Sequence, residues 1–62
     1  MTAHAELSSV STRLDELVKR ITEIADGLAG DDRDRIGADL YEVERTLRAA
    51  ERRLRRVIDA GR

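Results

Sequence analysis

Large aliphatic residues recur through the chain at alternating intervals of three and four residues. When Leu7 is taken as position a of a seven-residue repeat, the first half fills its successive a and d positions with Leu7, Val10, Leu14, Leu17, Ile21, Ile24 and Leu28. The second half fills the same two positions with Ile36, Leu40, Val43, Leu47, Ala50, Leu54 and Val57. This spacing places apolar side chains on one face of an α-helix, and each half carries about three repeats. The sequence therefore predicts two helices.

The segment between the two halves, residues 27–32, carries the signals of a turn. A glycine at position 27 or 30 suits the left-handed conformation that often ends a helix. Asp31 or Asp32 can accept the unpaired amide hydrogens that open the next helix. A single helix through both glycines is the alternative, but each glycine costs about 1 kcal/mol relative to alanine. We expect a helix over about 5–28, a turn over about 27–32 and a helix over about 32–60, with Gly61 as its stop. Thr2 can cap the first helix, but Ser8, Ser9, Ser11 and Thr12 also cap well, so we expect a frayed first turn or two.

Folding the chain about Gly30 gives an antiparallel hairpin in which every layer is apolar on both sides. Position a would meet position a, as in the pair Leu14 and Leu47, and position d would meet position d, as in Leu17 and Val43. The predicted fold is therefore all-α, with residues 1–62 forming one helical hairpin.

A third column of small or apolar residues widens this face. Position e carries Val18 and Ala25 in the first half and Gly37 and Ile58 in the second, interrupted by glutamates. Two helices cannot cover so wide a stripe by themselves, whereas two hairpins paired into a four-helix bundle can. We expect a homodimer, with the helix of a different protein as the alternative occupant. The predicted self-association and core residues are Leu14, Leu17, Val18, Ile21, Ile24, Ala25, Ile36, Leu40, Val43, Leu47, Leu54, Val57 and Ile58.

Length and composition support association. A chain of 62 residues buries only about 60% of its unfolded surface. It has no cysteine for a disulfide, and one histidine cannot build a structural metal site. Proline is absent and Tyr41 is the single aromatic residue, a composition typical of long helices and coiled coils. Disorder is the competing interpretation of a chain with 40% charged residues, but regularly spaced aliphatics disfavour it.

Basic residues concentrate in the second predicted helix. The b and f positions there form an outer stripe that, together with the neighbouring Arg56, is the candidate partner-binding surface: Tyr41, Arg45, Arg48, Arg52, Arg55 and Arg56. Such a stripe suits phosphates or an acidic protein. The alternative is a solvated face in which Glu44 pairs with Arg48 and Glu51 with Arg55. Twelve basic and thirteen acidic residues nearly cancel, which makes nucleic acid an improbable partner.

The remaining polar features predict no chemistry. Asp26, Asp31, Asp32 and Asp34 gather at the turn, where capping and the helix dipole account for them. In outline, such a tip resembles the coiled-coil finger of transcript-cleavage factors of the Gre type, whose acidic residues help hold a metal; the likeness covers one loop and no sequence motif. His4 is expected to be exposed or packed near Ile58, and no nucleophile, base and orienting residue share a usable spacing.

We therefore predict a small, non-enzymatic protein–protein interaction module, without cofactor or metal, that associates with itself through its heptad face. The alternative is a transcription-associated regulator that binds a sigma factor, polymerase or nucleic acid through the arginine stripe. No stretch is long and apolar enough to span a membrane, and the first residues lack the pattern of a signal peptide, so a cytoplasmic location is expected. The preference for arginine over lysine is typical of bacterial proteins from GC-rich genomes.

Overall fold

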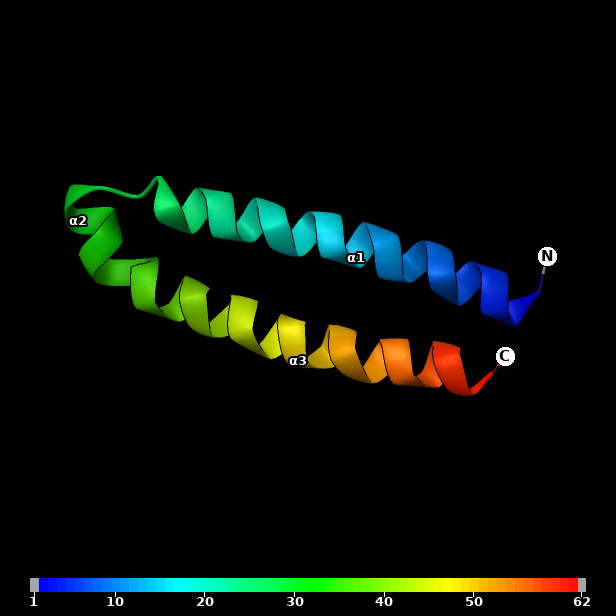
Figure 1. Ribbon diagram of the computed structural model, residues 1–62. Helices are drawn as coiled ribbons and strands as arrows, with labels where there is room; N and C mark the ends of the chain where they lie inside the picture. The colour runs from blue at the N-terminus through cyan, green and yellow to red at the C-terminus, as the bar shows by residue number, and fades with distance from the viewer. Residues whose placement is uncertain (1, 62) are drawn as a thin grey trace.

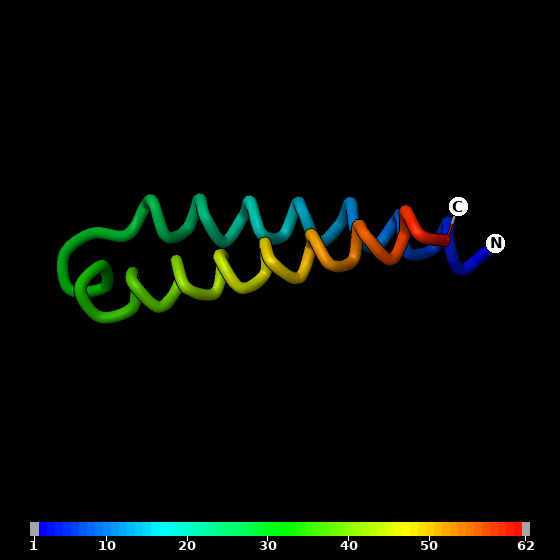
Figure 2. The backbone as a smooth tube through the Cα atoms, turned by 60° about the horizontal axis from the view of Figure 1, so that its bottom comes forward, coloured from blue at the N-terminus to red at the C-terminus, as the bar shows by residue number. Residues whose placement is uncertain are grey.

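Two long helices lie side by side and run in opposite directions. The computed structural model describes residues 2–61, in the order α1 (Ala3–Asp26), α2 (Gly30–Asp32), η1 (Arg33–Gly37) and α3 (Ala38–Ala60). The start of α1 lies beside the end of α3, and the short elements form the opposite tip of the rod (Figure 1). The helices stay together along their length when the molecule is turned (Figure 2). This arrangement confirms the predicted all-α hairpin.

The first helix begins at a side-chain cap. The Thr2 hydroxyl oxygen accepts a hydrogen bond from the backbone N–H of Ala5 at 3.2 Å, which satisfies one of the unpaired donors of the first turn. At the other end, the N–H of Gly27 donates to the carbonyl of Glu23 at 3.1 Å, and the backbone of Gly27 stays in the right-handed region. The helix thus begins and ends about two residues earlier than the pattern suggested.

The turn uses its glycines and aspartates differently from the expectation. Gly30, with φ of 59°, takes the left-handed conformation, but it opens the second helical segment instead of ending the first. Ala29 stands at the N-cap and makes no side-chain cap bond, so the expected cap by Asp31 or Asp32 does not form. Because the helix begins before them, both aspartates lie in its first turn. Their negative charges interact favourably there with the positive end of the helix dipole.

The second helical arm contains one widened turn. The residues of η1 have π-helical hydrogen bonding between the short α2 and the long α3. A π turn inserts one extra residue per turn and shifts the side chains that follow it around the helix. Gly37, the last residue of η1, is buried. At the far end the N–H of Gly61 donates to the carbonyls of Val57 and Ile58, both at 3.2 Å, where α3 stops as predicted.

The two helices meet through position e, not position d. The most buried residues of the described chain all stand at e: Val18, Ala25, Gly37, Glu51 and Ile58. Val18 is fully buried, whereas Leu17, beside it in the sequence, is 62% exposed. The residues at a are half-buried between the helices: Leu7, Leu14, Ile21, Leu28, Leu40, Leu47 and Leu54.

The expected layers of facing d residues are therefore wrong for the single chain. Val10, Leu17, Ile24, Val43 and Val57 are all exposed. Residues at position a lie between the helices whether d or e lies beside them in the seam. The two possible packings of the helices therefore differ in burying either d or e. The small residues at e, such as Ala25 and Gly37, allow the backbones to approach closely, which the larger d residues do not.

This seam gives the hairpin two different broad faces. In an antiparallel pair, equivalent columns of the two helices flank the seam on the same side. With a and e between the helices, the b residues of both helices border one broad face and the d residues of both helices border the other. The first face is polar and the second is apolar.

Replacing Val18 with alanine tests the seam. We expect this change to lower the free energy of unfolding by about 2 kcal/mol, because it leaves a cavity at the one fully buried side chain. The matched change Val10→Ala removes the same two methyl groups from an exposed d position and should cost much less. Urea denaturation measures both values in protein diluted until it sediments as a monomer, where Val10 is exposed. A larger loss for Val10→Ala would place d, not e, between the helices.

Candidate interaction faces

The apolar face consists of large aliphatic residues at d positions of both long helices: Val10, Leu17, Ile24, Val43 and Val57. Their exposed fractions run from 43% to 62%. Ile36 and Ala50 continue the same column, half-buried and exposed respectively. A contiguous row of exposed aliphatics along a rod is the kind of patch that marks a protein–protein contact in soluble proteins.

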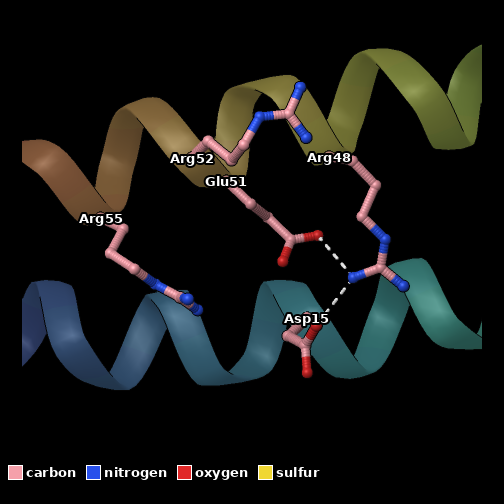
Figure 3. A pocket seen from close by; sticks show the side chains of 5 residues that line it. All are labelled: Asp15, Arg48, Glu51, Arg52 and Arg55. Carbon is pink, nitrogen blue, oxygen red and sulfur yellow. Dashed lines mark hydrogen bonds and ion pairs between the residues drawn. The ribbon is translucent and has the colours of Figure 1, made fainter.

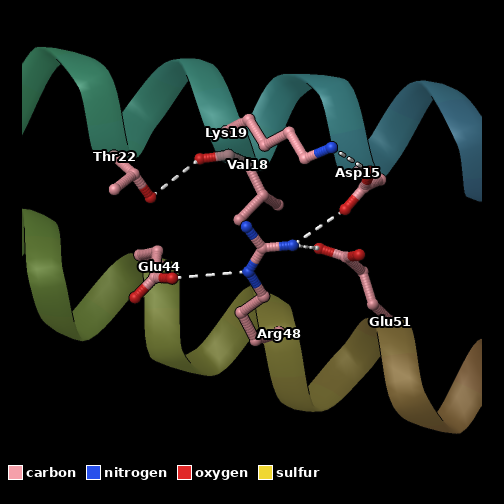
Figure 4. Close-up of polar contacts among 7 residues, drawn as sticks. All are labelled: Asp15, Val18, Lys19, Thr22, Glu44, Arg48 and Glu51. Carbon is pink, nitrogen blue, oxygen red and sulfur yellow. Dashed lines mark hydrogen bonds and ion pairs between the residues drawn. The ribbon is translucent and has the colours of Figure 1, made fainter.

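The polar face is closed by an ion network centred on Arg48. Its Nη1 donates to Asp15 Oδ1 at 2.8 Å and to Glu51 Oε1 at 3.4 Å, and its Nε donates to Glu44 Oε2 at 3.3 Å. Lys19 adds a contact from its Nζ to Asp15 Oδ2 at 3.1 Å. Figure 4 shows the guanidinium of Arg48 between the two helices with the carboxylates around it. Among residues 2–61, the Asp15–Arg48 pair is the one ion pair that joins α1 to α3.

This network shifts the titration of its central pair. Hydrogen bonds from Lys19 and then from Arg48 hold the pKa of the Asp15 carboxyl below its ordinary value. The hydrogen bond to Asp15 in turn raises the pKa of Arg48. Glu51 is only 8% exposed, so its charge needs the nearby guanidinium. Among the described residues, an ion pair joins the two helices on the polar face, and none joins them on the apolar face.

A second polar link joins the helices near the turn. The Tyr41 hydroxyl donates to Asp26 Oδ1 at 2.6 Å, from α3 to the last residue of α1. The acceptor carboxylate raises the pKa of the Tyr41 hydroxyl, because ionisation would set two negative oxygens together. Tyr41 and Arg48 were predicted on an outward stripe. They reach across to α1 instead, because a seam through a and e turns position b toward the partner helix.

The other arginines of the predicted stripe separate into two groups. Arg45 pairs with Glu42, with Nη2 to Oε2 at 2.6 Å. Farther along α3, Arg52 and Arg55 line a shallow hollow together with Asp15, Arg48 and Glu51 (Figure 3). Of the two pairs in the alternative interpretation of the stripe, Glu44–Arg48 is confirmed, whereas Glu51–Arg55 does not form because Glu51 faces Arg48.

The last two turns of α3 carry arginines that have no ion-pair partner among residues 2–61. We call them the basic end: Arg52, Arg53, Arg55 and Arg56. All four are exposed. Of the predicted stripe, Arg52, Arg55 and Arg56 thus remain exposed and without an ion-pair partner among residues 2–61, whereas Arg45 is exposed but paired with Glu42.

The histidine and the turn aspartates build no chemical centre in the part of the chain that the structure describes. His4 is half-buried beside Gly61 at the end of α3. Its Nε2 is buried without a hydrogen-bond partner among residues 2–61. Asp26 accepts from Tyr41, and Asp32 accepts from Arg35 at 3.2 Å. Within residues 2–61 no three acidic or histidine side chains are grouped to hold a metal ion. None of the helices described has the length and apolar character needed to cross a bilayer.

Comparison with family models, with curated proteins and with solved structures finds no match to the chain. The functional interpretation therefore rests on the hairpin's own surfaces. Sequence reasoning missed Asp15, Lys19 and Asp26 as partners of the predicted stripe. The signal was available in part, because Asp15 and Arg48 occupy the same b position on opposite sides of the turn and carry opposite charges.

Replacing Asp15 with asparagine tests whether the charge of Asp15 stabilises the fold in a pH-dependent way. A carboxyl whose pKa is lowered in the folded state stabilises the fold above its unfolded pKa of about 3.9, and this contribution is lost as the pH falls through the folded pKa. The parent should therefore melt at a higher temperature than Asp15→Asn at neutral pH, and the difference should begin to shrink below about pH 4 and vanish once the pH lies below the folded pKa of Asp15. Circular dichroism melts across the pH range measure it.

Glu16→Gln is the matched control, because Glu16 is the exposed neighbour of Asp15 and has no ion-pair partner among residues 2–61. Its melting temperature should follow the parent at every pH. A melting difference for Asp15→Asn that stays constant from neutral to acid pH would mean that the network does not act through the charge of Asp15.

Proposed function

We propose that the chain is a non-enzymatic protein–protein interaction module that associates with a second copy of itself through the apolar face. The observation that carries this proposal is the exposure of five large aliphatics along one side of a hairpin only 62 residues long. Burying them against another apolar surface removes them from water, which is the main favourable term in protein association.

The size of the face supports a stable contact. The hairpin measures 47 × 17 × 11 Å between Cα atoms, and the two helices side by side define its broad faces. The product of the two larger extents is about 800 Å², the area that each partner contributes to an interface of standard size. Two hairpins stacked on this face form a four-helix bundle.

The shape of the face supports a second copy as the occupant. Two straight, antiparallel helices present their d residues at the same seven-residue spacing, so the ridges of one copy match the grooves of another. The contact between two copies is isologous and closes after two chains. A single aromatic residue and a nearly neutral chain give weaker support to a nucleic-acid partner, which needs phosphate contacts along a basic surface.

A charge placed in the middle of the apolar face tests self-association. Leu17→Glu puts a carboxylate where the second copy would bury it, and this should convert a dimer of twice 7.0 kDa into a monomer. Thr12→Glu adds the same charge at an exposed position away from the face and should leave the dimer intact. Sedimentation equilibrium across a concentration series measures the mass of each protein. A parent chain that melts cooperatively and yet sediments at 7.0 kDa at micromolar concentration contradicts the proposal.

A further inference from the structure

Charge is divided unevenly along the rod. The Asp15–Arg48 pair lies near the middle of both long helices. On the open side of this pair, residues 2–14 and 49–61 carry five arginines and three acidic side chains. On the turn side, residues 16–47 carry nine acidic and five basic side chains. The hairpin fold brings these segments together, so the open half of the rod has a net charge of +2 and the turn half a net charge of −4, to which residues 27–37 at the tip contribute −1.

From this division we propose that the second copy lies antiparallel, with the acidic tip of each hairpin beside the basic end of the other. The inference rests on the proposed self-association through the apolar face and adds its direction. A twofold axis across the middle of the rod produces this arrangement, whereas a twofold axis along the rod places the two tips together.

The edges of the apolar face do not choose between the two directions. Its borders are the g positions, which carry Glu6 and Arg20 on α1 and Asp39 and Arg53 on α3. In the antiparallel arrangement Glu6 meets Arg20 of the second copy and Asp39 meets Arg53. In the parallel arrangement Glu6 meets Arg53 and Arg20 meets Asp39, so every pair is again complementary. The antiparallel arrangement also sets Arg13 opposite its symmetry mate, a single exposed contact of small effect.

The ends do choose. Packed helices lie about 8–10 Å apart, close to the screening length of about 8 Å at physiological salt, so end charges at the border or outer edge of the contact, such as Arg53 and Arg56, act on the second copy. Arg52 and Arg55 on the polar face lie farther from it and act more weakly. The parallel arrangement sets tip against tip and basic end against basic end, which is repulsive at both ends of the rod. The antiparallel arrangement is attractive at both ends.

This direction assigns a partner to the two charge clusters that the single chain leaves without one. The arginines of the basic end have no ion-pair partner within residues 2–61, and neither have Asp31 and Asp34 at the tip. In the antiparallel dimer each cluster lies at the same end of the bundle as the other copy's opposite charge. No separate anionic or cationic ligand is then needed to account for them.

Distances between spin labels test the direction. The chain has no cysteine, so Ala29→Cys and Glu16→Cys each give one labelling site, at the exposed tip and near the middle of the rod. Pulsed electron paramagnetic resonance should give a tip-to-tip distance close to the 47 Å length of the rod, and a much shorter distance between the central labels. Short distances at both sites would mean parallel hairpins and would overturn this inference alone. The absence of dipolar coupling at both sites would mean that no dimer forms, which overturns the proposed function as well.

Charge reversal gives a second test that needs no label. Arg52→Glu with Arg56→Glu changes the open end from five arginines and three acids to three arginines and five acids, at exposed positions away from the apolar face. Antiparallel hairpins should then dissociate about two- to threefold more readily, since four exposed and partly screened charges per dimer become repulsive. Adding Asp31→Lys and Asp34→Lys to the same chain should restore the affinity. In a parallel dimer the first pair of changes leaves the repulsion between open ends as it was, so an unchanged dissociation constant would overturn the inference.

Discussion

A pair of helices can bury only one seam between them, and this limit governs the whole molecule. Apart from His4, Ser11 and the glutamates at 44 and 51, the residues at a, d and e of the long helices are small, apolar or both, yet the hairpin covers only a and e. The d column, which holds most of the large branched side chains outside position a, is left in water. A chain with less apolar surface would have a closed hairpin and no reason to associate. The unused column is therefore the physical basis of the proposed function.

The sequence was sufficient to predict the helices and the hairpin, because both follow from local signals. The three-and-four spacing of Leu7 to Leu28, the paired glycines of the turn and the cap at Thr2 all act within a few residues of the chain. Whether d or e packs beside a in the seam does not follow from such local signals. Columns d and e lie on either side of a, so the same spacing is compatible with both. The decision depends on side-chain size across the two helices, as at Ala25 and Gly37, and on where a buried glutamate finds a cation.

Glu51 shows why the polar residues could be placed only in part. In the sequence it stands four residues before Arg55, and a pair between them is the simplest expectation. The seam turns Glu51 inward, where it is nearly buried and, among residues 2–61, pairs with Arg48. Arg48, which pairs with Glu51, therefore also points toward α1, where it forms an ion pair with Asp15. A seam through e in place of d thus turns Tyr41 and Arg48 from the predicted outward stripe toward α1, while Arg45, Arg52, Arg55 and Arg56 stay exposed.

The two broad faces also limit how far association can proceed. On the polar face Arg48 already contacts three carboxylates, so a further hairpin stacked there would have to desolvate a satisfied network without supplying new partners. The apolar face has no such bonds to lose. In the proposed dimer, the apolar face of each hairpin meets the same face of its copy about a twofold axis, so neither apolar face remains exposed after two chains. Closure of the proposed assembly at a dimer would then follow from the same choice of seam that separates the two faces.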